Sequence, residues 1–363
     1  MLHPIVSLVK SLVYKGMLYS GANALLLRSK WRQQRLLILC YHGISLADEH
    51  EWSALYMAED VFRNRLERIK EAGCNVLRLG DAVDLLKTGD LPPRAVVITF
   101  DDGYYDFYAK AWPHLRDFGY PATVYLTTYY SQFDAPVFDT ACYYMLWKAR
   151  GAAFGWPEMG IDKITLDATS AWRSGDKLIA WARQRRLEAP QKTEILHALA
   201  ARLSVDFESL FCRQRLMHIM TPAEIAELSA QGVDFQLHGH WHRVSRSREH
   251  FRNEIEQNKA ALERCGVSAP AHYCYPAGFH LPEFAGWLRE LGVRSAVTCR
   301  MALAAPGSDR YLLPRVLDAP GMSSDVFSTW LSGLAFWMPR KEYPSDPTQL
   351  EADPMPAQRY SAS

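Results

Sequence analysis

The chain has 363 residues, of which 48% are hydrophobic and 22% charged, so it is long enough for one large domain or two small ones. Its formal net charge of +1 gives no strong attraction to nucleic acid or acidic polymers, and we expect no nucleic-acid partner. Its seven cysteines form no CxxC pair, and this odd, scattered set argues against a disulfide framework and predicts a reducing, cytoplasmic location.

The first predicted element is a basic amphipathic segment over residues 1–35. Residues 1–47 contain no Asp or Glu, and the apolar positions near the start follow helical spacing. The uncharged run between Lys15 and Arg28 is shorter than the about 20 apolar residues that span a bilayer, and no signal-peptide cleavage site is evident. Two interpretations stay open: a helix on the inner, anionic face of the membrane, or a helix packed against the domain.

Strand and helix patterns then alternate along the chain. The β-rich runs are Leu36–Tyr41, Asn75–Leu79, Ala95–Phe100, Ala122–Thr127, Val233–His238, Ala271–Tyr275, Arg294–Cys299 and Tyr311–Val316. Helix-period segments lie between most of them, at about 60–73, 81–88, 107–118, 222–231, 249–265 and 281–291. This alternation predicts an α/β fold with a parallel sheet, and the number of strands favours a (β/α) barrel.

The alternating pattern sets the expected domain boundaries, with one barrel domain over residues 36–335. Between about 130 and 220 the pattern is mostly helical, and we interpret this stretch as an insertion on a βα loop that borders a substrate cleft. Residues 336–363 carry Pro, Ser and charged residues without periodicity, which predicts a disordered tail.

Candidate catalytic groups stand at the ends of two predicted strands. The strand Ala95–Phe100 runs into the adjacent aspartates Asp101 and Asp102, a sequence that alone is also a common turn. The strand that begins at Val233 runs into three imidazoles within five residues: His238, His240 and His242. Two His four residues apart can converge on one ion, and two His with one carboxylate form a common catalytic ligand set.

These residues resemble the motifs of the polysaccharide deacetylases, the NodB-like carbohydrate esterases. The similar segments are Cys40–Gly43 in the opening strand, Thr99–Gly103 for the first motif, His238–His242 for the second and Tyr275–Gly278 for the third. The resemblance covers about residues 36–335 apart from the insertion. It implies a distorted (β/α) barrel of about seven strands that hydrolyses non-peptide C–N bonds. The implied substrate is an N-acetyl or other N-acyl group on an amino sugar of a polysaccharide, oligosaccharide or glycolipid.

The same resemblance implies roles for the four central residues. Asp102, His238 and His242 would bind a divalent cation, expected to be zinc, and Asp101 would be the general base. A divalent cation can activate water and polarise a carbonyl, which amide hydrolysis needs. Its charge would also let both adjacent carboxylates stay ionised.

The resemblance also implies that the third motif contacts the substrate and the oxyanion. The backbone N–H near Ala277 would help to hold the developing oxyanion. We likewise expect Tyr275, Pro276 and His42 to contact the substrate or the oxyanion.

The chain departs from the family pattern in each later motif. Gly239 stands where Ser or Thr is usual, Cys274 where Arg is usual, and Ala277 where Tyr is usual. In the last motif Arg315 stands in place of the His that acts as general acid. An arginine does not release its proton at working pH, so we assign Arg315 to orient Asp101 or to stabilise the oxyanion.

The general acid stays unassigned, and other functions stay open. The candidate acids near predicted strand ends are His42, His240 and His280. A deformylase of a lipid-linked amino sugar would fit the basic N-terminal segment, and a sugar-binding module without catalysis would fit the missing acid. A structural metal site is the weakest alternative, because structural zinc normally takes four protein ligands.

Overall fold

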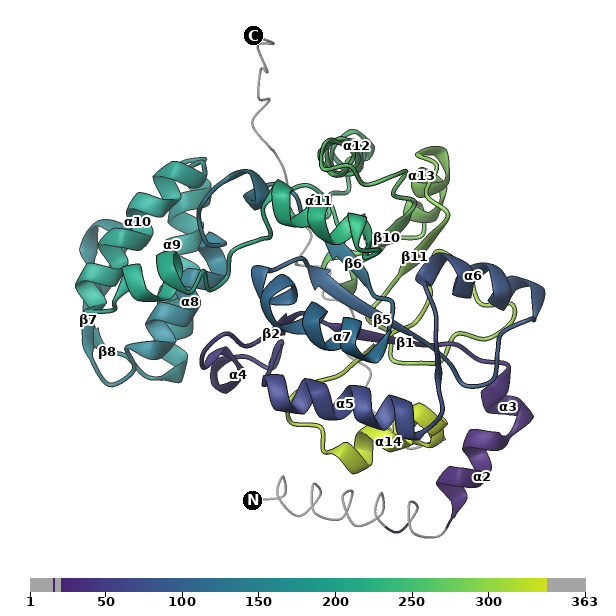
Figure 1. Ribbon diagram of the computed structural model, residues 1–363. Coiled ribbons are helices and arrows are strands. Elements are labelled where there is room, and N and C mark those ends of the chain that lie inside the picture. Colours follow the sequence, from purple (N-terminus) through teal and green to yellow (C-terminus); the bar gives the residue numbers. More distant parts are fainter. Residues whose placement is uncertain (1–15, 17–20, 338–363) are drawn as a thin grey trace.

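The computed structural model describes residue 16 and residues 21–337, and a curled parallel sheet lies at its centre (Figure 1). The strand order is β11-β10-β9-β6-β5-β1-β12, and β4 pairs with β5 off this path. The strands are β1 Leu37–Tyr41, β4 Asn75–Val76, β5 Ala95–Asp102, β6 Thr123–Leu126, β9 Asp234–Leu237, β10 His272–Cys274, β11 Ser295–Val297 and β12 Val316–Leu317. The central strand β5 is apolar on both faces, as is typical of a parallel sheet that is covered on both sides.

The segment around β12 brings the two edges of the sheet together. Leu313 forms a parallel bridge with Val297 of β11, and Val316 pairs with Leu39 of β1. The sheet therefore curls into a distorted barrel, which confirms the predicted fold class. The last strand is shorter and lies later than the predicted Tyr311–Val316, because Pro314 lacks the N–H that a continuous ladder needs.

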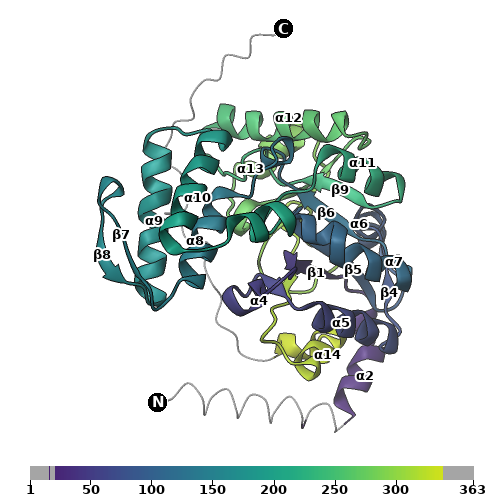
Figure 2. The same ribbon diagram turned by 60° about the vertical axis from the view of Figure 1, so that its left-hand side comes forward.

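Helices cover the outer face of the sheet, and Figure 2 shows them around the strands. They are α5 Glu59–Glu71, α6 Leu79–Thr88, α7 Trp112–Phe118, α11 Pro222–Ala230, α12 Arg248–Arg264, α13 Phe284–Glu290 and α14 Ser324–Ser332. A π-helical turn, Phe107–Ala111, precedes α7. The loop after β1 carries the short elements β2 Gly43–Ile44, α4 Glu49–Trp52 and β3 Tyr56–Met57.

The stretch between β6 and α11 forms a lobe beside the barrel (Figure 1, left). Its helices and strands are α8 Phe138–Lys148, β7 Ala153–Trp156, β8 Ile161–Thr165, α9 Ala168–Gln184 and α10 Ala189–Leu203. The antiparallel pair β7–β8 was not predicted within this mostly helical stretch. The lobe reaches the barrel loops at Tyr129, whose hydroxyl accepts the Ala189 N–H while its own N–H donates to the His240 carbonyl.

Only part of the basic N-terminal segment is described, as α2 Ala22–Arg28 and α3 Lys30–Gln33. The predicted amphipathic positions near the start and most of the predicted tail lie outside the described residues. Buried Arg32 ties α3 to the barrel domain, since its guanidinium donates to the carbonyls of Leu331 and Ala95. Over residues 21–337, no helix is both long and apolar enough to pass through a membrane.

Candidate active site

The end of β5 turns sharply and carries the two aspartates. Asp102 has a left-handed φ of 66°, and Gly103 follows with φ 82°. A Cβ on Gly103 would lie 1.9 Å from Cδ1 of Leu126, so only glycine fits there. The turn gives Asp101 and Asp102 different partners, which are Arg315 for the first and two histidines for the second.

Asp102 meets the two histidines that follow β9. Its Oδ1 lies 3.5 Å from Nε2 of His238 and 3.4 Å from Nε2 of His242. Two ligand atoms about 2.0–2.1 Å from one ion, at a tetrahedral angle, are about 3.3 Å apart. The three side chains therefore fit a common divalent cation. His242 is 44% exposed, which leaves one side of the group open for water or substrate.

Neighbouring groups orient these side chains for binding a cation. Nδ1 of His238 lies 2.8 Å from the Cys274 carbonyl, which fixes a proton on Nδ1 and leaves Nε2, on the side of Asp102, as the atom that would bind a cation. Burial alone would raise the pKa of Asp102, but the nearby imidazoles of His238 and His242 outweigh it and lower the pKa to about 2. Asp102 is therefore an ionised carboxylate at neutral pH.

Asp101 forms a buried, bidentate ion pair with Arg315. The two oxygen–nitrogen distances are 2.6 Å from Oδ1 to Nη1 and 2.7 Å from Oδ2 to Nη2. Burial alone would raise the pKa of Asp101, but the Arg315 guanidinium holds it well below its usual range. The guanidinium also donates to the Thr298 carbonyl and to the Thr99 hydroxyl. Arg315 thus fixes the orientation of Asp101. Oδ1 keeps a second lone pair for water, whereas the thiols of Cys40 and Cys274 lie against Oδ2.

Replacing Arg315 by methionine is expected to lower the free energy of unfolding by about 3–5 kcal/mol, because the Asp101 carboxylate would stay buried without its partner. Urea unfolding of the chelator-treated protein measures this loss. The double variant Asp101→Asn/Arg315→Met is the control, and it should recover part of the lost stability because the buried charge is gone. A loss below about 1 kcal/mol in the single variant would contradict the ion pair.

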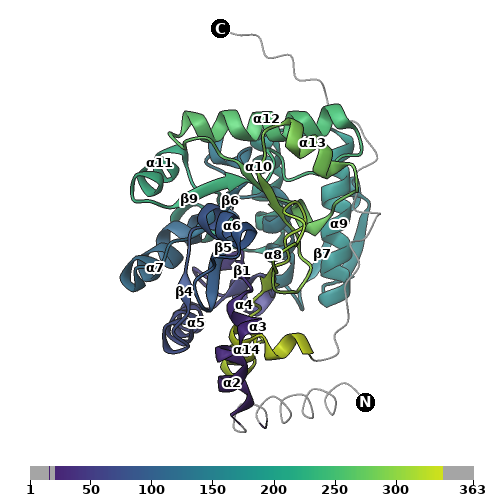
Figure 3. The ribbon, with the colours of Figure 1, turned by 90° about the vertical axis from the view of Figure 1, so that its right-hand side faces the viewer.

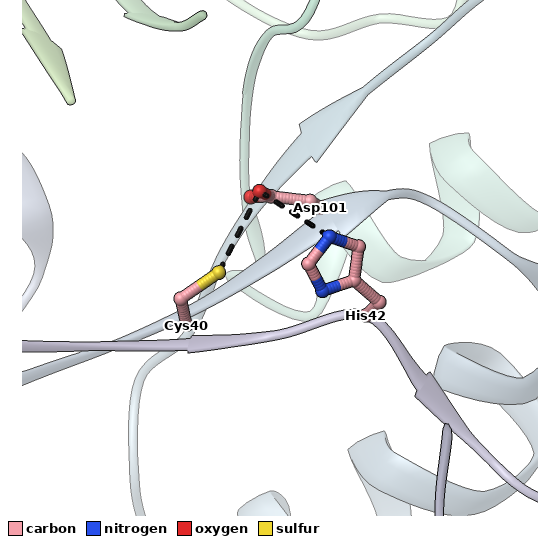
Figure 4. Close-up of side chains that lie close together, drawn as sticks. All are labelled: Cys40, His42 and Asp101. Atoms are coloured by element: carbon pink, nitrogen blue, oxygen red, sulfur yellow. Dashed lines mark hydrogen bonds and ion pairs between the residues drawn. The ribbon is translucent and has the colours of Figure 1, made fainter. Parts of the chain in front are cut away.

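His42 approaches Asp101 from the other side, and Figure 4 shows both His42 and Cys40 pointing at the carboxylate. Nε2 of His42 lies 3.9 Å from Oδ2 of Asp101, and the side chain is 17% exposed. Its Nδ1 is buried and finds no hydrogen-bond partner among the described residues. The Cys40 thiol lies 3.6 Å from the same oxygen. Cys40 and His42 are two positions apart, and side chains two positions apart along a strand point to the same face.

The other two candidate acids have different partners. Nδ1 of His240 lies 2.8 Å from the Thr128 hydroxyl, and His240 is buried. Nδ1 of His280 lies 2.9 Å from the Gly278 carbonyl, and its ring packs against Tyr275. Of the three predicted candidates, His42 is the one that the structure places against Asp101.

The third-motif segment lies beside the site through Cys274. The Cys274 thiol is buried and lies 3.4 Å from Oδ2 of Asp101. Tyr275 and Pro276 are buried, and the Tyr275 ring packs on Tyr273. Ala277 is exposed, with its N–H donating to none of the described residues.

Three residues with uncommon backbone conformations lie at the site end of the barrel. Asp102, His242 and Ala277 all have positive φ, at 66°, 57° and 53°. Such conformations are uncommon in residues other than glycine and persist only where surrounding contacts enforce them. Their grouping at one end of the barrel supports a functional role for this end.

Three buried polar residues around the histidine loop were not predicted. Asn258 and Glu254 of α12 bind the backbone of residues 238–241, and Thr128 after β6 contacts both Asn258 and His240. A signal was present in the sequence: positions 254 and 258 lie on the same helical face as Phe251, Ile255 and Leu262. Polar residues on an otherwise apolar, buried face call for a specific partner.

Comparison with known proteins agrees with these motifs. A family model described as polysaccharide deacetylase matches residues 88–139 and 195–296, which include both aspartates and both histidines of the candidate metal site. A Bacillus subtilis (strain 168) protein named as a polysaccharide deacetylase, YxkH, is 34% identical over 94 residues, or 25% of this chain and 32% of that protein. The poly-beta-1,6-N-acetyl-D-glucosamine N-deacetylase of Escherichia coli (strain K12) is 29% identical over 103 residues, or 28% of this chain and 15% of that protein. These matches reach at most about a third of the relatives' own length.

Solved structures share the fold over most of the chain. The deacetylase PplD of Streptococcus pyogenes, solved with acetate, has a TM-score of 0.54 and 19% identity, over 81% of this chain and 96% of that one. IcaB from Ammonifex degensii has a TM-score of 0.51 and 17% identity, over 83% of this chain and 98% of that one. The family model and the named relatives thus make residues 88–139 and 195–296 similar to the polysaccharide deacetylases, and the solved structures show the shared barrel fold.

Proposed function

We propose that the chain is a metal-dependent hydrolase that removes the N-acetyl group from amino sugars of a glycan. The observation that carries this proposal is the convergence of Asp102, His238 and His242 beside the buried Asp101–Arg315 pair. The named activity of the E. coli relative supports an N-acetylglucosamine-containing glycan as the substrate class. A divalent cation at the three ligands, with zinc proposed, would activate water and polarise the amide carbonyl.

The remaining catalytic roles fall to side chains and a backbone N–H of the chain itself. Asp101, held by Arg315, accepts the proton of the attacking water as general base. Arg315 keeps its own proton and acts by positioning that carboxylate. The N–H of Ala277, which donates to none of the described residues, is proposed as a donor for the oxyanion that develops on the carbonyl oxygen.

We propose His42 as the general acid that protonates the leaving amine. It is the candidate imidazole next to Asp101, it is partly exposed, and it follows β1, which pairs with β5 on the side away from β6 and β9. An amine is a poor leaving group unless it receives a proton, so hydrolysis needs such a donor. An imidazole can give its proton near neutral pH, unlike the guanidinium of Arg315.

Replacing His42 by glutamine is expected to lower kcat on an N-acetylglucosamine oligomer by about 10²–10³-fold while metal affinity stays unchanged. Acetate release measures the first quantity, and chelator competition measures the second. An aryl acetate is the discriminating substrate, because its phenolate leaves without a proton and its hydrolysis should fall much less. Equal losses on both substrates would contradict the acid role of His42.

The overall proposal is tested with the full chain loaded with one equivalent of zinc. We expect acetate release from N-acetylglucosamine oligomers, and no release after chelation. Faster formate release from N-formyl analogues would favour the deformylase alternative, and binding of glycan without release of either acid would favour an inactive sugar-binding module. Contact of residues 1–35 with the membrane and the cytoplasmic location stay predictions.

A further inference from the structure

Helix α12 contacts the histidine loop at two positions one turn apart. Figure 3 shows α12 lying along the outside of the barrel near β9. Oδ1 of Asn258 accepts the N–H of His238 at 2.9 Å and the N–H of Gly239 at 3.0 Å. Oε2 of Glu254 accepts the N–H of Trp241 at 2.9 Å. Three backbone amides of the loop are therefore held from one helix.

The amide nitrogen of Asn258 extends this network to a second strand end. Nδ2 donates to the Leu126 carbonyl and to the Thr128 hydroxyl, both at 3.0 Å. The Thr128 hydroxyl accepts that bond, so its own hydrogen is free to be donated to Nδ1 of His240 at 2.8 Å. Asn258 is fully buried and uses both amide atoms twice, so it joins the end of β6 to the loop after β9.

The loop conformation depends on these contacts. Gly239 has φ 81°, and His242 has φ 57°, which a residue with a side chain rarely adopts. A Cβ on Gly239 would lie 2.8 Å from Oε2 of Glu254. The usual Ser or Thr at this position would therefore clash with the Glu254 carboxylate, which agrees with the glycine found here. The loop brings His238 and His242 together, with ring centroids 4.8 Å apart.

We propose that Asn258 and Glu254 are positioning residues that hold the His238–His242 loop in its metal-binding conformation. The inference rests on the proposed function, because it concerns the affinity of the same three-ligand site. The contacts of both residues described above are with backbone amides of the loop and not with the ligand nitrogen atoms. They act through the backbone amides that set where the two imidazoles point. Polar groups that orient metal ligands typically contribute 10–100-fold to metal affinity.

Zinc affinity of the chelator-treated full chain, measured by competition with a chromophoric chelator, tests this inference. We expect Asn258→Leu to weaken zinc binding about 10–100-fold and to alter the visible spectrum of the Co²⁺-loaded protein. Glu254→Ala should weaken it by about tenfold, and Glu254→Gln, which keeps an acceptor oxygen, should restore most of the loss. The Glu254 pair keeps the inference testable if Asn258→Leu fails to fold.

A variant on the same helix separates positioning from general stability. Leu262 is buried one turn beyond Asn258, and Leu262→Ala should lower the melting temperature without changing zinc affinity. The inference is overturned if Asn258→Leu and Glu254→Ala bind zinc within about twofold of wild type, or if Leu262→Ala weakens zinc binding equally. Tight zinc binding by wild type without acetate release, together with the predicted losses in the variants, would reject the proposed function and still support the positioning role.

Discussion

Asp102→Asn and His238→Ala are each expected to lose the bound cation and to lower kcat/KM by more than about 10³-fold. The reason is that three protein ligands meet here, and Asp102 supplies their one negative charge. Removing a cation that stabilises charge in the transition state costs several kcal/mol, and each 1.36 kcal/mol is tenfold in rate.

Metal content of the purified variants, measured by atomic emission, tests this expectation alongside acetate release. His114→Ala is the matched control, because His114 pairs with Glu59 on the outer helices and contacts none of the candidate ligands. The control should keep one metal ion and full activity. Variants of Asp102 or His238 that keep both would reject the ligand assignment.

Asp101→Asn is expected to keep the metal ion and to lower kcat by about 10²–10⁴-fold, because an amide oxygen cannot take the proton of water. Asparagine is nearly the same size and can still accept one hydrogen bond from Arg315, but the buried guanidinium loses its counter-charge, so we also expect a lower free energy of unfolding. Single-turnover acetate release and metal titration on the same sample separate the two effects. Full activity in this variant would refute the general-base assignment, whereas loss of metal would show that Asp101 is itself a ligand.

The fold could be predicted because strand and helix periodicity agrees with the tertiary structure over most of the barrel. The apolar run of β5 and the helix face of α12 each lie where the pattern placed them, within one or two residues. The hairpin β7–β8 was not predicted because its strands are short and lie between helices of the lobe, where the helical periodicity of the neighbouring segments dominates. The last strand was misplaced because Pro314 interrupts the ladder between Leu313, which meets β11, and Val316, which meets β1, and periodicity does not show that change of partner.

The candidate site could be predicted as a set of residue types at strand ends, since parallel strands bring their carboxyl ends to one edge. Which partner each side chain takes depends on tertiary distances. The pairing of Asp101 with Arg315 joins residues 214 positions apart, and the sequence left the role of Arg315 open between two alternatives. The choice of His42 among three histidines likewise follows from its position after β1, the direct neighbour of β5.

Anomalous diffraction at the zinc edge, from crystals of the zinc-loaded chain, tests the metal site most directly. We predict one ion about 2.0–2.2 Å from Oδ1 of Asp102 and from Nε2 of both His238 and His242, with the fourth position open toward Asp101 and His42. An ion held by a different set of side chains, or no ion at saturating zinc, would contradict the account.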